Sequence, residues 1–540
     1  MSASLAPAAR IFALLAAGRA ALPRRVTPGA LHLATCAVFL SLIFAPVLAI
    51  YAFGVAPSSQ GNPLMMDLLK PRLAPRSATD PQKGLAAEIL ERSQLRETLI
   101  GVRSWLAYNV AGYVDTPLVV SGRDGWLFYK EEFWGGRCLE DRVWTTLLNE
   151  MDLLTGIAKP TGMRLFFTVA PDKSALYPEQ LDPRSAIYWK CKAQNSARWR
   201  ALAAERAPGL IDHKTALDAV KAAGVPLYFQ TDTHWNLYGG AVAIRQLAAA
   251  TLEIPSRELP EAVPLPEAYR HPSDMRRMLK LAGTDLSPLP NNADDTRFVA
   301  RAAIDARTTA IIHDSFYFYV APLIEAVFKG TNRFHMRKVE GLDNVVLRNP
   351  SLLIVESVER SLPLRFGDGP YGVNGALGQA IIANNRKAAN RCIFGKENMA
   401  DALADEQMHE LSRSGRKFVS SGVDPWVVLD LPEGGSGSPC LRLSVTVKAP
   451  TRLEIFLPPR KGRIAADMFE AGRVLPIPLA AGENHIKLVL PDDLVVRKIR
   501  IDPVIGIRRF VIDDIAFGYD SGVEQLEYPA AAFTSALPYQ

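Results

Sequence analysis

Acidic residues are absent from the first 66 positions, and no charged residue of either sign occurs between Val26 and Met66. The charged side chains that precede Asp67 are Arg10, Arg19, Arg24 and Arg25. Because four of the six net positive charges lie there, the remaining 474 residues carry a net charge of only about +2. So small a charge excludes the basic footprint of a nucleic-acid-binding protein.

The uncharged stretch contains an apolar run from Leu31 to Val55, which is long enough to cross a bilayer as a helix. Since the arginines lie only on its N-terminal side, the positive-inside rule predicts a cytoplasmic segment over 1–29 and a transmembrane anchor over 30–55. A cleaved signal peptide is the alternative. The run is long for such a peptide and lacks a small-x-small cleavage site, which favours the anchor.

Cysteine is scarce, and the sequence contains neither a Cys-x-x-Cys pair nor the Cys/His spacing of a zinc site. Cys36 lies within the predicted anchor, which leaves Cys138, Cys191, Cys392 and Cys440 in a compartment that permits disulfides. Four cysteines allow three pairings. We expect nearest neighbours to pair, and free buried thiols are the alternative. A glycine-rich phosphate loop is also missing, so no nucleotide cofactor is expected.

Two kinds of pattern follow a proline-rich linker over 56–83. From about 144 to 365, strand-like runs such as "RLFFTVAPDK" alternate with helical patterns, which predicts an α/β fold with a mainly parallel sheet and flanking helices. After about 415, short alternating runs separated by turn residues predict an antiparallel β-sandwich. We therefore expect an α/β domain over 84–400 and a sandwich over 415–540.

Two polar motifs follow predicted strands, at the sheet edge where ligands usually bind. "TDTHW" contains Asp232 and His234, whose spacing allows a carboxylate to fix the tautomer of an imidazole. "HDSF" places Ser315 at the start of a predicted helix, whose N-terminus favours an oxyanion. Each motif alone is more typical of a helix cap or a packed histidine. Together they predict a serine nucleophile with its base and orienting acid.

Five stretches occur in a fixed order: "GRDGWLFY", "APDKSALYPEQL", "TDTHWN", "HDSF" and "LLIVESVERSL". Over about 115–365, this series resembles the alginate O-acetyltransferase family (AlgX/AlgJ-like), whose catalytic domain is similar to SGNH hydrolases. The resemblance implies a triad of Ser315 as nucleophile, His234 as base and Asp232 as orienting acid. It also implies that the Asp/His pair precedes the serine in the chain.

The resemblance further implies a periplasmic enzyme, anchored in a bacterial inner membrane, that acetylates hydroxyls of an exopolysaccharide in a pathway such as alginate biosynthesis. Because acetyl-CoA is cytoplasmic, a multi-pass membrane acyltransferase would supply the acetyl groups. No cofactor or metal is expected. The sandwich is a candidate carbohydrate-binding module, with a structural role as the alternative. A carbohydrate esterase with the same triad and a non-catalytic polysaccharide-binding scaffold are alternative functions.

Five side chains near these motifs are predicted to line the substrate site, because sugar rings stack on aromatic faces and the Pro-Asp-Lys stretch lies in the matched series: Lys173, Tyr177, Trp235, Tyr317 and Tyr319. Their alternative is core packing, or a structured loop for the first two.

Two further features of the matched series concern backbone and charge. His313 replaces the glycine that the family carries before Asp-Ser, which leaves the oxyanion hole unassigned and admits His313 as a competing base. Glu359 and Arg360 are expected to form a structural ion pair.

Overall fold

The computed structural model describes residues 94–207, 209–253, 264–281, 283–290, 309–328, 331–336, 341–432, 437–460, 468–469, 471–504, 509–520 and 522. Residues 103–540 form one compact unit. Of the other unit, residues 1–102, only the start of helix α5 (Gln94–Trp105) is described. The predicted anchor over 30–55 and the linker over 56–83 therefore lie outside the described residues. Among the described helices, none is long and apolar enough to cross a membrane.

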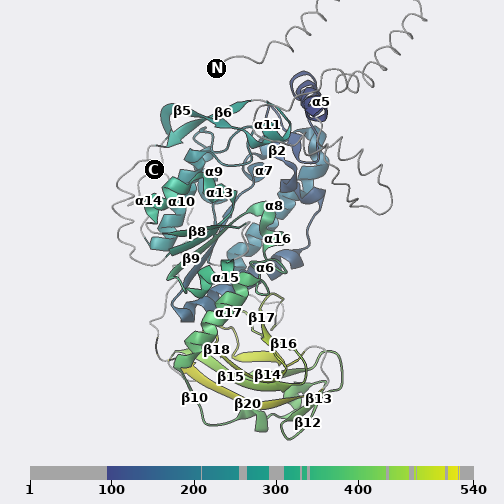
Figure 1. Ribbon diagram of the computed structural model, residues 1–540, viewed down its shortest axis with the longest axis vertical. Helices are drawn as coiled ribbons and strands as arrows, with labels where there is room; N and C mark the ends of the chain where they lie inside the picture. The colour runs from purple at the N-terminus through teal and green to yellow at the C-terminus, as the bar shows by residue number, and fades with distance from the viewer. Residues whose placement is uncertain are drawn as a thin grey trace, which may run out of the picture. The chain divides into compact units, whose positions relative to one another are not determined.

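A parallel five-stranded sheet forms the centre of the first folded region (Figure 1). Its strands are, in spatial order, β4 (Leu210–Asp212), β3 (Arg164–Ala170), β9 (Leu352–Val358), β7 (Thr309–His313) and β8 (Asn332–His335). Every residue of β3, β7 and β9 is buried, as expected for central strands covered on both faces. The prediction of an α/β fold with a mainly parallel sheet is confirmed.

The two faces of the sheet contribute to two separate cores. On one face, Leu165 and Phe167 of β3 pack in a cluster with α6 (Asp141–Ala158), α8 (Ala186–Arg206) and α17 (Ala376–Ala388). On the other face, Phe166 packs with α9 (Lys214–Lys221), α10 (Leu237–Leu252) and α14 (Ala321–Val327). This alternation follows from the two-residue period of a strand.

Several short elements complete the first folded region. "GRDGWLFY" forms the turn and the second strand of a hairpin made of β1 (Val119–Ser121) and β2 (Leu127–Tyr129). The other short elements are α7 (Lys173–Leu176), β5 (Pro264–Pro272), α11 (Asp274–Met278), β6 (Thr284–Pro290), α13 (Ser315–Tyr319), α15 (Leu342–Leu347) and α16 (Leu362–Arg365).

The segment before "TDTHW" is not the predicted strand. Residues 225–236 form a loop in which Tyr228 and Trp235 make an isolated antiparallel bridge. The loop precedes α10, where Gly239 lets the first turn approach closely, since a Cβ there would lie 2.2 Å from the Leu227 carbonyl oxygen. Consequently, the "TDTHW" motif is positioned by side-chain contacts rather than by the sheet.

Two antiparallel sheets form the C-terminal region, as predicted. One contains β10 (Cys392–Phe394), β12 (Leu411–Ser414), β13 (Lys417–Ser420), β20 (Arg509–Asp520), β15 (Ser438–Val447) and β18 (Gly482–Val489). The other contains β11 (Met408–His409), β14 (Trp426–Asp430), β19 (Lys498–Asp502), β16 (Thr451–Phe456) and β17 (Val474–Leu479). Side chains of both sheets, such as Leu443 and Ile455, belong to one buried cluster.

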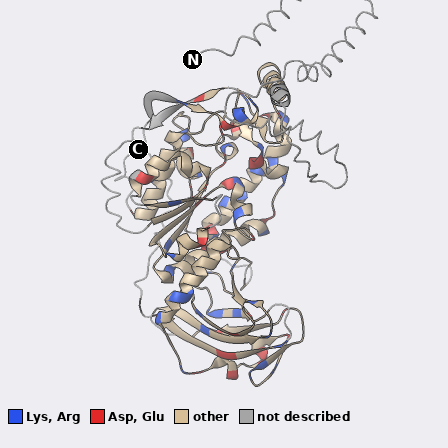
Figure 2. Ribbon diagram, viewed as in Figure 1, with Lys and Arg blue, Asp and Glu red and all other residues tan. Residues whose placement is uncertain are grey.

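Two disulfides join nearest neighbours, Cys138 to Cys191 and Cys392 to Cys440. This confirms the predicted pairing, while Cys36 lies outside the described residues. Basic and acidic residues are interspersed along the described chain (Figure 2), in keeping with its small net charge.

Candidate active site

Ser315, His234 and Asp232 form a continuous hydrogen-bonded chain. Ser315 Oγ lies 2.8 Å from His234 Nε2, and His234 Nδ1 lies 2.7 Å from Asp232 Oδ1. Because an ionised carboxylate can only accept, Nδ1 carries the proton and Nε2 is left to accept from the serine. Two segments about 80 residues apart in the sequence therefore meet in the geometry that a nucleophilic serine requires.

Asp232 is a buried acid with both oxygens engaged. Oδ1 also accepts the backbone N–H of His234 at 3.0 Å, and Oδ2 accepts that of Asp274 at 2.8 Å. The Nε2 atom of His271 lies 3.4 Å from Oδ2. Burial alone would raise the pKa of Asp232, but the hydrogen bonds from His234 and His271 outweigh it and hold this pKa well below its ordinary value. The carboxylate therefore remains ionised beside the imidazole.

Two threonine–aspartate pairs fix the backbone on either side of Asp232. Asp274 accepts from the backbone N–H and the hydroxyl of Thr233 at 2.9 and 2.6 Å. Asp285 accepts in the same way from Thr231, at 2.9 and 2.7 Å. Thus the polar residues of "TDTHW" serve the site and not a helix cap. The cap of α10 is Asn236, whose Oδ1 accepts from the Gly239 N–H at 2.8 Å.

Lys173 is fully buried and supports the same loop through hydrogen bonds to its backbone. Its ammonium donates to the carbonyl oxygens of Phe229, Gln230 and Asp232 at 3.3, 3.1 and 2.8 Å. Burial lowers the pKa of Lys173 to about 8. Tyr177 is also buried, and its hydroxyl accepts from the Leu227 N–H at 2.9 Å. Both side chains were predicted to contact substrate, but their positions favour a role in holding the loop.

The three predicted aromatic residues differ in position. Trp235 and Tyr317 have no exposed surface; Trp235 donates to the Phe316 carbonyl at 3.0 Å, and the Tyr317 hydroxyl lies 2.9 Å from Nε2 of His213. A side chain without exposed surface cannot stack on a sugar. Tyr319 is partly exposed, and its ring centre lies 4.2 Å from that of His234. Tyr319 alone among the five candidates therefore lies where a substrate could reach it.

Asp314, which directly precedes Ser315, is a helix cap, the alternative role that the sequence pattern allows for the "HDSF" motif. Asp314 caps α13, because its Oδ1 accepts the Phe316 N–H at 2.8 Å. His313 is buried at the end of β7, where Nδ1 donates to the Asp314 carbonyl at 2.8 Å. Burial lowers the pKa of His313 and so favours a neutral ring. The serine hydroxyl instead contacts His234.

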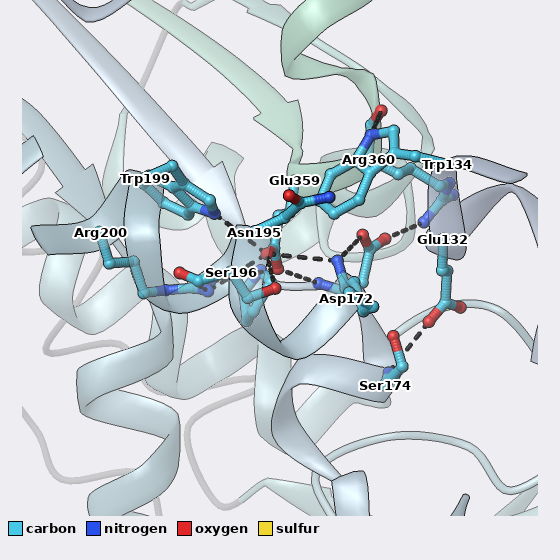
Figure 3. A network of polar contacts seen from close by, with 12 residues as sticks. Glu132, Trp134, Asp172, Ser174, Asn195, Ser196, Trp199, Arg200, Glu359 and Arg360 are labelled. Atoms are coloured by element: carbon cyan, nitrogen blue, oxygen red, sulfur yellow. Dashed lines mark hydrogen bonds and ion pairs between the residues drawn. The ribbon is translucent and has the colours of Figure 1, made fainter. Parts of the chain in front are cut away.

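Glu359 and Arg360 belong to a buried network that holds the loop after β3 (Figure 3). Glu359 pairs with Lys192 and Arg200, each at 3.2 Å, whereas Arg360 pairs with Asp172 at 2.7 Å. The predicted ion pair therefore needs correction, since each residue contacts other partners. Glu359 Oε2 also accepts the Asp172 N–H at 3.1 Å. Because Asp172 directly precedes Lys173, the network also fixes the lysine that holds the loop of Asp232 and His234.

Metal ligation is the other chemistry that this cluster could offer. Ligand atoms of Asp232, His234 and Asp274 lie within 4.8 Å of one another. However, the carboxylate oxygens already accept from Thr233, from the Asp274 N–H and from the imidazole. These carboxylates therefore hold the His234 imidazole toward the Ser315 hydroxyl. Sequence reasoning missed Asp274, Asp285 and His271, because no pattern in the sequence marks them.

Comparison with known proteins identifies the same resemblance that the motifs predicted. Residues 119–314 match the model of the family described as "SGNH hydrolase-like domain, acetyltransferase AlgX". The match includes Asp232 and His234 and ends one residue before Ser315. The resemblance to the alginate O-acetyltransferases is thereby confirmed for this part of the chain.

Curated relatives of this chain have the name probable alginate O-acetylase AlgJ. A probable alginate O-acetylase AlgJ of Pseudomonas syringae is 33% identical over 159 residues, which is 28% of this chain and 38% of that protein. AlgJ of Pseudomonas fluorescens is 30% identical over 196 residues, 34% of this chain and 46% of that protein. The matches thus span less than half of the relatives' length.

Among solved structures, the O-acetyltransferase domain of Pseudomonas putida AlgJ aligns with 46% of this chain and 93% of that chain, at 20% identity and a TM-score of 0.31. AlgX of Pseudomonas aeruginosa aligns with 74% of this chain and 93% of that chain, at 13% identity and a TM-score of 0.32. At such scores, the structural likeness adds nothing to the sequence matches.

Proposed function

We propose that this protein is an O-acetyltransferase that moves acetyl groups to hydroxyls of a polysaccharide, with Ser315 as nucleophile. The observation that carries the proposal is the chain of contacts from Asp232 through His234 to Ser315, at 2.7 and 2.8 Å. The sequence match to a model named for the acetyltransferase AlgX supports the type of acyl group. Alginate is the first acceptor to consider, because the relatives are named alginate O-acetylases.

The reaction proceeds in two acyl transfers. First, His234 Nε2 takes the proton of Ser315 as Oγ attacks the acetyl carbonyl, and this proton then passes to the leaving group. The product is an acetyl ester on Ser315. Next, His234 takes the proton of a sugar hydroxyl, which attacks this ester, and the proton returns to Ser315 Oγ. During both steps the imidazolium is paired with Asp232, whose carboxylate is already ionised in the resting site.

Aromatic side chains of α13 provide the surface on which a sugar acceptor packs. Tyr319 lies against His234, with 4.2 Å between the ring centres, and the neighbouring Phe318 is 64% exposed. Sugar rings offer apolar faces to such side chains. A stacked sugar would bring its hydroxyl to the acyl-enzyme and compete with water for the acetyl group.

The acetyl donor and the location complete the proposal. The apolar run from Leu31 to Val55 would anchor the chain in a bacterial inner membrane, with the folded region in the periplasm. A multi-pass membrane acyltransferase partner would then pass acetyl groups across the bilayer. These two features rest on the sequence pattern and the family resemblance.

The test uses the full chain with a chromogenic acetyl ester as donor and deacetylated alginate as acceptor. We expect chromophore release and ester-linked acetyl groups on the alginate, both lost in Ser315→Ala, His234→Ala and Asp232→Ala. Equal chromophore release from the parent and all three variants contradicts the role of the triad. Release without acetylated alginate points to a hydrolase that uses the same residues, or to a different acceptor, which deacetylated glycans of other composition would reveal.

A further inference from the structure

The motif "LLIVESVERSL" contributes two buried glutamates that the catalytic steps do not use. Glu356 and Glu359 lie at the end of β9 and in the turn after it, and neither has exposed surface. Each accepts a hydrogen bond from the backbone of a loop that carries site residues. Glu359 accepts from Asp172, which precedes Lys173, and Glu356 Oε2 accepts from the Asp314 N–H at 2.8 Å.

The position of Glu356 matters because the sheet does not hold the turn that carries Ser315. Pairing between β7 and β9 ends at Ile312 and Val355. Beyond this point, the contacts from Asp314 to β9 use side chains: Asp314 Oδ2 accepts the Val358 N–H at 2.8 Å, and the Asp314 N–H reaches Glu356. The Asp314–Glu356 contact thus replaces the strand ladder one residue before the nucleophile.

A proton on Glu356 completes this contact. Both Asp314 oxygens accept backbone N–H groups, those of Phe316 and Val358, as expected for an ionised carboxylate. Glu356 Oε1 is buried and has no hydrogen-bond partner among the described residues. Burial raises the pKa of Glu356 well above its ordinary value and the Asp314 charge raises it further, whereas the hydrogen bond from the Asp314 N–H and, less strongly, the Arg365 charge oppose the shift. Tyr317 and Tyr371 also sense the charge of Glu356, and burial is the main cause that raises the pKa of Tyr317 well above its ordinary value and that of Tyr371 to about 12.

We propose that neutral Glu356 is a positioning residue for Ser315, which ties the nucleophile turn to β9 by accepting from the Asp314 N–H and donating to the Asp314 carboxylate. The functional part of this inference rests on the proposed role of Ser315. A glutamine reproduces both the acceptor and the donor, an alanine neither. A misplacement of about 1 Å in a reacting group can cost on the order of 10²-fold in rate, so loss of this tie should be measurable.

The experiment measures how fast Ser315 reacts with methanesulfonyl fluoride in the full chain, by mass spectrometry of the intact protein and its peptides. In this reaction Ser315 Oγ bonds to sulfur, fluoride leaves and His234 takes the proton, so no acetyl donor or sugar is needed. We expect Glu356→Gln to react at the parent rate and Glu356→Ala about 10²-fold more slowly. Glu150→Gln is the matched control, since Glu150 is another buried glutamate that accepts a backbone N–H, that of Gly367.

Infrared spectroscopy provides a second measurement that does not depend on activity. At about pH 9, where Glu150 is ionised because its pKa is raised only to about 7, the parent should show a protonated-carboxyl band that Glu356→Gln lacks and Glu150→Gln retains. This result decides the protonation state even if Glu356→Ala does not fold.

Three results would overturn the inference: a parent without this band, a Glu356→Gln variant that loses reactivity, or a folded Glu356→Ala variant that reacts at the parent rate. Failure of the parent itself to react at Ser315 would instead count against the proposed function, and the infrared band would then decide the protonation of Glu356 alone.

Discussion

Asp232 is the residue whose hydrogen bonds determine the state of the base. One oxygen faces the imidazole of His234, while the other accepts the Asp274 N–H and lies near His271. The same carboxylate therefore fixes the ring and selects its tautomer, and in the proposed reaction it pairs with the imidazolium. A neutral isostere keeps the shape of this residue and removes all three electrostatic effects.

Asp232→Asn should lower kcat for the chromogenic ester by about 10⁴-fold, because an amide allows the wrong imidazole tautomer next to Ser315. KM should change little, since Asp232 has no exposed surface with which to contact substrate. Steady-state kinetics at several ester concentrations separate the two constants. The exposed Asp218→Asn is the control, and a loss of kcat below about tenfold for Asp232→Asn contradicts this role.

Some site residues could be predicted from sequence because their chemistry is local. Asp232 and His234 share one loop, and Ser315 follows an apolar strand that periodicity reveals. Asp274 and Asp285 reach the site only through the path of the chain between α10 and β7, and no spacing in the sequence marks them. Likewise, residue type alone could not show that Lys173 is buried against three carbonyl groups.

Helix α6 contains a buried glutamate that joins it to the segment after β9. Glu150 on this helix is 4% exposed and accepts the Gly367 N–H at 2.8 Å. Burial raises the pKa of Glu150 to about 7. A raised pKa means that the folded protein binds a proton here at pH values where the unfolded chain has already released it.

This proton makes stability depend on pH. The contribution of Glu150 is fully present below about pH 4.5 and is lost as pH rises through about 7, a total of about 3 kcal/mol. Relative to Glu150→Gln, whose side chain does not titrate, the parent should therefore lose up to about 3 kcal/mol of unfolding free energy over this range. Denaturant titrations of both proteins at a series of pH values check this, and parallel pH profiles would refute it.

The disulfide from Cys138 to Cys191 ties the segment before α6 to α8, and Cys191 directly precedes the buried Lys192. Replacing both cysteines by serine should lower the unfolding free energy by about 2–4 kcal/mol, because the bridge closes a loop of about 53 residues in the unfolded chain. Urea unfolding measures the loss, with Cys392→Ser/Cys440→Ser as the comparison. An unchanged midpoint together with an unchanged slope would contradict this expectation.

At the level of elements, alternation of apolar residues predicted the strands after 415 well, because a half-buried antiparallel strand has a two-residue period. It failed for β10, which lies at the end of the predicted α/β domain, and for β11 and β12, which lie between the two predicted domains. These strands have two to four residues, too few to display a period. Pairing with neighbouring strands stabilises them: β10 pairs with the long strand β20, β11 with β14 and β12 with β13.

The two folded regions share one buried core. Asn385 on α17 donates to the carbonyl oxygens of Ile157 and Val489 at 2.8 and 2.9 Å, which joins α6 to β18. Asp152 on α6 pairs with Arg473 and, at 3.1 Å, with Arg460, both from the sandwich. We therefore expect the α/β region and the sandwich to unfold in a single cooperative transition.

Asp152→Ala tests this coupling. It leaves Arg473, which is 2% exposed, as an unpaired buried charge, and this should cost about 3–5 kcal/mol of unfolding free energy. Calorimetry should show one transition in the parent and a lower one in the variant. Replacing the exposed Asp430 by alanine is the control, since Lys498 pairs with Asp430 at the surface. Two separate transitions in the parent would show that the regions are independent.

The central claim is that Ser315 carries the acetyl group, and mass spectrometry of the quenched reaction tests it most directly. The full chain is mixed with the chromogenic acetyl ester, stopped in acid and digested. We predict one acetyl group on the peptide that contains Ser315, which disappears when deacetylated alginate is added and never forms in His234→Ala. Acetylated alginate produced by Ser315→Ala, or an acetyl group found only on another residue, would contradict the account.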